Sequence, residues 1–348
     1  MALIYRKETQ LKKAIISGLT GQDGSYLAEN LLDKGYEVYG IVRRVSTPNY
    51  KNIQQLLNEP HLHLEEGDIT DLSSLIRLFN KVKPDEIYNL AAQSYVAISW
   101  DEPIHTSNTT GIGALNVFES ARQTCPEAKI YQASSSEMFD GITFPQTEQT
   151  HYKPRSPYGV SKLFAHEMAR IYKESYGMFI CCGILFNHES PRRGIEFVTQ
   201  KIVDTIVRQI CGEDVVLELG NMEARRDWSH AADMVEGMWL MLQNDKPENF
   251  ILASGETHSI FEFVNTVYSY FGIDIIWITK DDLPIGYDLE GKVLVKSVDK
   301  YYRPNEVQTL LGDSTRARKE LCWIPEFNFQ ALVVDMIVSK LNEYTHNF

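Results

Sequence analysis

A glycine-rich turn near the N-terminus constrains the fold of this chain more than any other feature. The segment GLTGQDG at residues 18–24 follows the apolar run AIIS directly and precedes the helical pattern SYLAENLLDK, which Gly35 closes. Glycines permit a tight turn and a close approach of the backbone to a pyrophosphate, and a helix N-terminus supplies N–H donors and positive potential. A strand, a glycine turn and a helix in this order predict a dinucleotide-binding unit.

The strand-helix alternation continues through the first half of the chain. Strand-like runs occupy residues 14–17, 37–42, 61–66, 86–91, 129–134 and 178–186, with helical stretches such as ALNVFESAR at 114–122 between them. Crossover helices must cover both faces of a parallel sheet, so this order predicts an α/β Rossmann-type doubly wound parallel sheet. After residue 186 the alternation loosens. We therefore expect an NADP-binding Rossmann domain over residues 11–186, to which some later segments return. Residues 187–348 are then mainly a smaller mixed α/β substrate-binding domain.

The expected cofactor site extends from the turn to the ends of the next three strands. Its members are Gly18, Thr20, Gly21, Gln22, Asp23, Gly24, Arg43, Asp68, Ile69, Leu90 and Ala91. The second strand runs into Arg43 and Arg44, where NAD enzymes usually place an acid. A guanidinium suits a 2′-phosphate, so we favour NADP; the alternative is two solvated surface arginines. Asp68 could bond the adenine amino group or cap its own loop.

A second motif carries the expected chemistry. In SPYGVSK, Ser156 is a helix N-cap and Pro157 opens the first turn, so Tyr158 and Lys162 lie four apart on one helical face. A phenol has a pKa near 10, but an adjacent ammonium favours phenolate. This pair can deprotonate a substrate alcohol as hydride leaves for nicotinamide.

The composition limits the classes of binding partner and the cellular compartment that we expect for this chain. The formal net charge of -13 argues against a general affinity for nucleic acid or anionic membranes, and no apolar run reaches membrane-spanning length. The N-terminal charges follow the first apolar residues, the reverse of a signal peptide, so we expect a cytoplasmic protein. The five cysteines form no CxxC pair, and we expect them to be reduced and to bind no metal.

These motifs resemble the extended short-chain dehydrogenase/reductase family, in which Tyr and Lys act with a Ser or Thr just after the preceding strand. The resemblance implies that Ser135, in the run Ser134-Ser135-Ser136-Glu137, hydrogen-bonds the reacting oxygen. A carboxylate two residues later is what nucleotide-sugar 4,6-dehydratases carry, so Glu137 completes the expected catalytic set with Tyr158 and Lys162. The alternative is a surface acid in a loop.

The second half is similar to the GDP-mannose 4,6-dehydratase family in the strings LFNHESPRRG, GNMEARRDW, SGETHS and YRPNEV, and the similarity runs from about residue 13 to about residue 323. It implies a substrate pocket lined by Asn187, Val198, Lys201, Arg226, Arg303 and Glu306. Three of these are cations that can neutralise a diphosphate, and Glu306 can accept hydrogen bonds from hydroxyl groups. The chain departs from the family pattern at Ser135, usually Thr, at Asp140, usually Gly, and at Ser229-His230. The stretch after Glu137 is also shorter.

The resemblance implies conversion of GDP-mannose, or of a GDP-manno-heptose, to the GDP-4-keto-6-deoxy sugar by internal hydride transfer from C4 to C6 through NADP. One alternative is a reductase or epimerase of the same fold, acting on an oxidised GDP sugar. The other is a catalytically silent NADP-binding regulator. The family implies a homodimer or homotetramer, and residues 43–52 resemble a loop that reaches a neighbouring subunit's cofactor.

Overall fold

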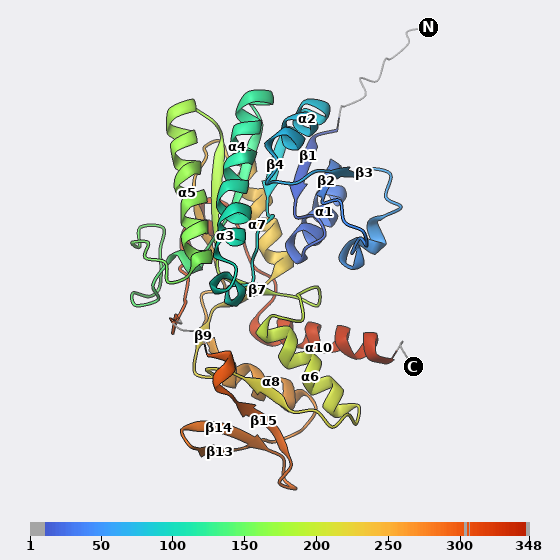
Figure 1. Cartoon of the computed structure of the whole chain (residues 1–348), viewed down its shortest axis with the longest axis vertical. Coiled ribbons are helices and arrows are strands. Elements are labelled where there is room, and N and C mark those ends of the chain that lie inside the picture. The colour runs from blue at the N-terminus through green and yellow to red at the C-terminus, as the bar shows by residue number, and fades with distance from the viewer. Residues whose placement is uncertain (1–10, 303–304, 306, 346–348) are drawn as a thin grey trace.

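A computed structural model of the 348-residue chain describes residues 11–302, 305 and 307–345. It has a large lobe built on a seven-stranded parallel sheet and a smaller lobe below it (Figure 1). The strand order is β11-β6-β5-β4-β1-β2-β3, and every pairing is parallel. The strands are β1 (Lys13–Ser17), β2 (Glu37–Val42), β3 (Leu62–Glu66), β4 (Glu86–Asn89), β5 (Lys129–Ser135), β6 (Ile180–Leu185) and β11 (Phe250–Leu252). The predicted Rossmann-type sheet and its first six strands are confirmed.

Helices cover both faces of this sheet, as the alternation predicts. The helices α1 (Gln22–Asp33) and α7 (Ala231–Gln243) bury their apolar residues in one core beneath the sheet. The helices α2 (Leu72–Val82), α4 (Gly113–Thr124) and α5 (Pro157–Tyr176) form a second core on the other face. Because helices cover both faces, the central strands β4 and β6 are buried along their whole length, whereas the edge strand β3 is partly exposed.

The catalytic helix α5 starts and stops where its sequence indicates. Ser156 Oγ accepts a hydrogen bond from the Gly159 N–H at 3.0 Å, and Pro157 occupies the first turn. Gly177 ends the helix with a φ of 68°, a left-handed conformation that costs glycine little. Short helical segments lie between the longer elements: α3 (Pro103–Thr106), α9 (Thr315–Glu320), η1 (Lys51–Leu56), η2 (Ala97–Trp100), η3 (Ser107–Ile112), η4 (Ser136–Met138) and η5 (Asp299–Tyr301).

The smaller lobe contains a mixed four-stranded sheet and three helices around their own core. Its strands, in sheet order, are β13 (Ile276–Lys280), β14 (Leu283–Tyr287), β15 (Val293–Ser297) and β8 (Leu217–Leu219). Its helices are α6 (Val198–Ile210), α8 (Ile260–Tyr270) and α10 (Phe329–Thr345). The mixed α/β character expected of this region is confirmed.

Two short strand pairs lie where the chain passes between the lobes. The strand β7 (Asn187–Glu189) pairs in parallel with β10 (Trp228–His230), and β9 (Arg225–Arg226) pairs antiparallel with β12 (His258–Ser259). The later strand β11 belongs to the large sheet and α7 packs on it, whereas the domain boundary at residue 186 stays a prediction.

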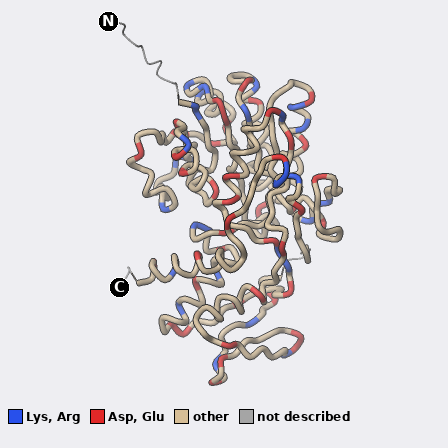
Figure 2. Tube along the Cα trace, turned by 180° about the vertical axis from the view of Figure 1, so that it is seen from behind, with Lys and Arg blue, Asp and Glu red and all other residues tan. Residues whose placement is uncertain are grey.

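Charges of both signs are scattered over the two lobes along the trace in Figure 2. Among the described residues, no helix is both long and apolar enough to cross a bilayer.

Candidate active site

One cavity of about 1300 Å³ lies between the carboxyl edge of the large sheet and the smaller lobe. Every predicted cofactor, catalytic and substrate residue that the structure describes lines it. The predicted residues Arg303 and Glu306 lie outside the described residues. The cavity follows the rule that open α/β sheets bind ligands beyond the carboxyl ends of their strands.

The glycine turn has the shape of a dinucleotide cradle. Gly18 has a φ of 77°, and a Cβ on Gly24 would lie 2.2 Å from the Gly18 carbonyl oxygen. Gly21 is the N-cap of α1 and supplies no side-chain cap, so the first N–H groups of the helix are left for an anion. These observations fit a bound pyrophosphate.

We predict that Gly24→Ala weakens dinucleotide binding on the order of 100-fold, equivalent to about 2.7 kcal/mol. The added methyl group would meet backbone atoms of residues 18 and 19, so the turn itself must move. Fluorescence titration with the cofactor measures the loss. Gly272→Ala is the control, because a Cβ on Gly272 would meet nothing within 4 Å and the residue lies just after α8, away from the turn. Unchanged affinity in Gly24→Ala would contradict the cradle.

Two predicted cofactor residues use their side chains to fix the backbone that lines the cavity. Gln22 donates from Nε2 to the His188 carbonyl at 3.1 Å and accepts from Ser190 Oγ at 2.8 Å. Asp68 Oδ1 accepts from the Thr70 N–H and hydroxyl, both at 2.8 Å. Asp68 Oδ1 therefore caps its own loop, which is the alternative considered for this residue.

Asp23 forms a partly buried ion pair that sequence reasoning missed. His188 Nε2 lies 2.8 Å from Asp23 Oδ2, and its Nδ1 lies 2.7 Å from the Phe186 carbonyl oxygen. Both partners are acceptors, so both ring nitrogens carry hydrogen and His188 is an imidazolium. Burial opposes both charges, but each charge stabilises the other. The pKa of Asp23 falls to about 2 and that of His188 is raised.

This pair predicts a pH window for stability. Because the pKa of His188 is raised in the folded protein, its positive charge stabilises the fold fully below the ordinary histidine value of about 6.5. This stabilisation is lost as pH rises through the folded-state pKa. Because the pKa of Asp23 is lowered, its negative charge stabilises the fold above about pH 4, and this stabilisation is lost as pH falls toward 2. We expect the melting-temperature gap between the native protein and His188→Gln to be largest between about pH 4 and 6.5. The gap should narrow above this range, and one that widens up to pH 9 would refute the imidazolium. His61→Gln, at an exposed site, is the control.

The catalytic residues meet at the ends of β5 and α5. Ser135 Oγ accepts from the Glu137 N–H at 3.2 Å, and its hydroxyl hydrogen-bonds the Tyr158 phenol. Lys162 Nζ donates to the Ala133 carbonyl at 2.7 Å and lies 5.8 Å from the centre of the Tyr158 ring. The carboxylate of Glu137 lies close enough to oppose ionisation of Tyr158.

The sequence predicts that Lys162 favours the phenolate form of Tyr158, whereas the surroundings of Tyr158 favour the neutral phenol. Burial raises the pKa of Tyr158 to about 12, although the Ser135 hydroxyl works in the opposite direction. Burial also lowers the pKa of Lys162 to about 8. The protein groups alone therefore keep Tyr158 as a phenol at neutral pH, so a further positive charge is needed for it to act as a base.

The predicted substrate residues form the lower wall of the cavity. Lys201 Nζ donates to the Glu218 carbonyl at 2.6 Å and lies 3.6 Å from the centre of the Tyr301 ring, where it lowers the pKa of that phenol. Arg226 is buried, and its Nη1 donates to the Arg225 carbonyl at 2.9 Å. Asn187 and Val198 line the same wall at the starts of β7 and α6.

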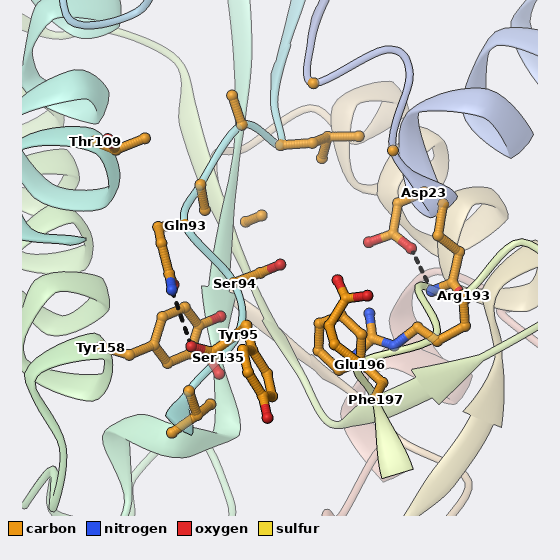
Figure 3. A pocket seen from close by; sticks show the side chains of 18 of the residues that line it. Asp23, Gln93, Ser94, Tyr95, Thr109, Ser135, Tyr158, Arg193, Glu196 and Phe197 are labelled. Carbon is orange, nitrogen blue, oxygen red and sulfur yellow. Dashed lines mark hydrogen bonds between the residues drawn. The ribbon is translucent and has the colours of Figure 1, made fainter. Parts of the chain in front are cut away.

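Sequence reasoning missed further lining residues, which Figure 3 displays around the pocket. Gln93, Ser94 and Tyr95 follow β4 and lie on the same side as Tyr158 and Ser135. Arg193, Glu196 and Phe197, which precede α6, also line the pocket (Figure 3), and the Phe197 ring packs edge-on against Tyr95 at 5.7 Å. The first group directly follows the carboxyl end of a predicted strand, and that position could have identified it.

Comparisons with known proteins identify the family of the chain. A family model described as GDP-mannose 4,6 dehydratase matches residues 15–336. A Homo sapiens protein named GDP-mannose 4,6 dehydratase is 48% identical over 335 residues, which cover 93% of this chain and 90% of that protein. A Yersinia enterocolitica GDP-mannose 4,6-dehydratase is 44% identical, with 96% of this chain and 95% of that protein covered.

Two solved structures share the fold. The UDP-glucose 4-epimerase of Thermotoga maritima, solved with UDP-glucose, has a TM-score of 0.79 at 21% identity and covers 96% of this chain and 99% of its own. The dTDP-glucose 4,6-dehydratase of Bacillus anthracis, solved with NAD, has a TM-score of 0.78 at 20% identity and covers 97% and 98%.

Proposed function

This chain belongs to the GDP-mannose 4,6-dehydratase family, and we propose how its residues carry out that reaction. It is a hydro-lyase that converts GDP-mannose to the GDP-4-keto-6-deoxy sugar and water. The observation that carries the proposal is the meeting of Ser135, Glu137, Tyr158 and Lys162 in the cavity that also contains the glycine turn.

The cofactor is a nicotinamide dinucleotide held by the turn at residues 18–24 and by Lys162. When bound, it supplies a hydride acceptor and donor for C4 and C6 of the sugar and, in its oxidised form, a positive charge beside the site. That charge is the kind of group that the buried Tyr158 needs to become a base.

The protein residues then carry two protons between atoms of the sugar. Tyr158 takes the proton of the C4 hydroxyl, while the Ser135 hydroxyl hydrogen-bonds the same oxygen. The resulting 4-ketone acidifies the C5 hydrogen, which Glu137 removes as a proton and passes to the C6 hydroxyl, so that water leaves. After hydride has arrived at C6, the Tyr158 phenol protonates C5 and is ready for the next turnover. The sum is loss of one water, with no net oxidation.

Product analysis tests this proposal. The enzyme is incubated with substoichiometric cofactor and GDP-mannose, and mass spectrometry follows the sugar nucleotide. A dehydratase turns over many times per cofactor and yields a product lighter by one water. Turnover that stops when the cofactor is used up would favour the reductase or epimerase alternative. A parallel reaction with GDP-manno-heptose tests the competing substrate, because Ser135 leaves more room than Thr beside the sugar.

NADP is our proposal for the cofactor. Arg43 follows β2 directly, is exposed, and lines the cavity. A guanidinium at this position favours a 2′-phosphate, which a carboxylate would repel. We expect Arg43→Ser to weaken NADP binding by about tenfold, or about 1.4 kcal/mol, and to leave NAD binding almost unchanged. Titrations with both cofactors measure this, and equal losses for the two would contradict it.

We also propose that the enzyme is a homodimer or homotetramer. Large apolar side chains are exposed on α3, η3 and α5, among them Ile104 at 73% and Val160 at 55%, together with Ile112, Phe164 and Ile171. Contiguous apolar surface of this kind marks protein interfaces. Analytical ultracentrifugation of the native protein and of Val160→Glu tests this face: a native monomer, or an oligomer that Val160→Glu leaves intact, would refute it.

A further inference from the structure

Three residues spaced by four along α5 contact the last three residues of β5. Tyr158, Lys162 and His166 lie on one face of the helix, and each is at most 8% exposed. The first meets Ser135 and the second donates to the Ala133 carbonyl. His166 completes the series, because its Nδ1 lies 2.8 Å from Ser134 Oγ. The proposed mechanism assigns no role to His166 or Ser134.

The surroundings of His166 determine its tautomer. The Cys182 N–H donates to Asn249 Oδ1 at 2.9 Å, which fixes that amide so that Nδ2 faces His166 Nε2 at 3.5 Å. The Tyr152 hydroxyl lies 3.2 Å from the same nitrogen. Because Asn249 Nδ2 is a donor, Nε2 is an acceptor and the ring hydrogen is on Nδ1. Burial lowers the pKa of His166 to about 4, in agreement with a neutral ring.

His166 therefore joins three parts of the large lobe behind the active site. Nδ1–H holds β5 one residue before Ser135. Nε2 contacts Asn249, which directly precedes β11, and Tyr152, whose ring packs edge-on at 5.1 Å. Tyr152 closes the loop that follows Glu137, because the next N–H, that of Lys153, donates to the Met138 carbonyl at 2.8 Å. Ser135 and Glu137 thus both belong to segments that His166 fixes.

We propose that His166, as the neutral Nδ1–H tautomer, is a positioning residue that fixes Ser134 and thereby sets Ser135, Glu137 and Lys162 against Tyr158. The inference rests on the proposed function, because it assigns these four residues to the reaction. Small displacements of a catalytic group by a distant substitution lower turnover steeply, by up to about 10²-fold for 1 Å. We expect substitutions of His166 to lower kcat rather than to raise KM, because His166 does not line the cavity that binds substrate and cofactor.

Three variants separate positioning from bulk packing. His166→Phe keeps the ring volume and removes both nitrogens, His166→Asn keeps a donor near Nδ1, and His166→Gln moves the amide toward Nε2. We expect His166→Phe and His166→Gln to lose roughly 10- to 100-fold in kcat. Their KM for GDP-mannose and their cofactor affinity should stay within about twofold of native, and His166→Asn should recover most of kcat. His61→Phe, at an exposed site beside the opposite edge of the sheet, is the control.

A second set of measurements keeps the proposal falsifiable if His166→Phe folds poorly. Ser134→Ala should lower kcat by the same factor as His166→Phe, and the double variant should lose no more than either single one. Nitrogen NMR of the histidines, assigned by the signal missing in His166→Asn, should show Nδ1–H. The proposal would be overturned if the His166 ring carried its hydrogen on Nε2 or were charged, or if the losses in kcat of the two single variants were additive. Equal kcat in His166→Phe and His166→Asn would also overturn it. Native protein that binds no cofactor would instead overturn the proposed function.

Discussion

Tyr158→Phe is expected to lower kcat by about 10³-fold, within the 10²- to 10⁴-fold range of positioned acid-base groups. The change removes one hydroxyl from a buried ring and keeps its packing. Without that hydroxyl, the C4 proton loses its assigned acceptor, since the Ser135 hydroxyl is a much weaker base than a phenolate and Lys162 Nζ donates to the Ala133 carbonyl. In a single-turnover experiment, neither reduced nicotinamide nor keto sugar should appear.

Tyr176→Phe is the matched control for this change. Tyr176 ends the same helix and is 55% exposed, so its variant should turn over like the native enzyme. Cofactor affinity of Tyr158→Phe should stay within about threefold of native, since the loss of one exchangeable hydrogen bond is worth only about 0.5–1.5 kcal/mol. Turnover of Tyr158→Phe within tenfold of native would remove Tyr158 from the base role.

Local signals made the large lobe predictable. The strand-turn-helix at Lys13–Asp33 and the N-cap at Ser156 are specified by residues adjacent in sequence, and a parallel sheet places the carboxyl ends of its strands at one edge. Knowing the strands was therefore enough to bring Ser135 near the glycine turn.

The rest depends on contacts between distant segments. The strand β11 is three residues long, and its place at the sheet edge is set by pairing with β6, in which Phe250 lies beside Gly183, and no sequence periodicity reveals this pairing. The pairing of Asp23 with His188 spans 165 positions. The ionisation of Tyr158 was also beyond the sequence, because the spacing of Tyr158 and Lys162 says nothing about how deeply the phenol is buried.

Glu137→Gln should stop the reaction one step later than Tyr158→Phe. The amide keeps the shape of the side chain, and the Glu137 N–H still donates to Ser135 Oγ, so oxidation at C4 should proceed. No base then removes the C5 hydrogen. We expect kcat for dehydration to fall by about 10³-fold, while up to one enzyme equivalent of reduced nicotinamide and 4-keto sugar accumulates.

The step assigned to Glu137 can be located by isotope exchange and by comparison with a second carboxylate of the same cavity. In deuterated water the native enzyme introduces deuterium at C5, whereas Glu137→Gln should introduce none. Glu196 lines the same cavity but is drawn apart from Tyr158 in Figure 3, so Glu196→Gln should still exchange C5 and release water. Glu137 lies two residues after Ser135, which ends β5, so the backbone keeps Glu137 near the Tyr158 phenol. Glu196 belongs to a different segment and has no such constraint. If Glu196→Gln abolished exchange and Glu137→Gln preserved it, Glu196 would be the base and the assignment of Glu137 would fail.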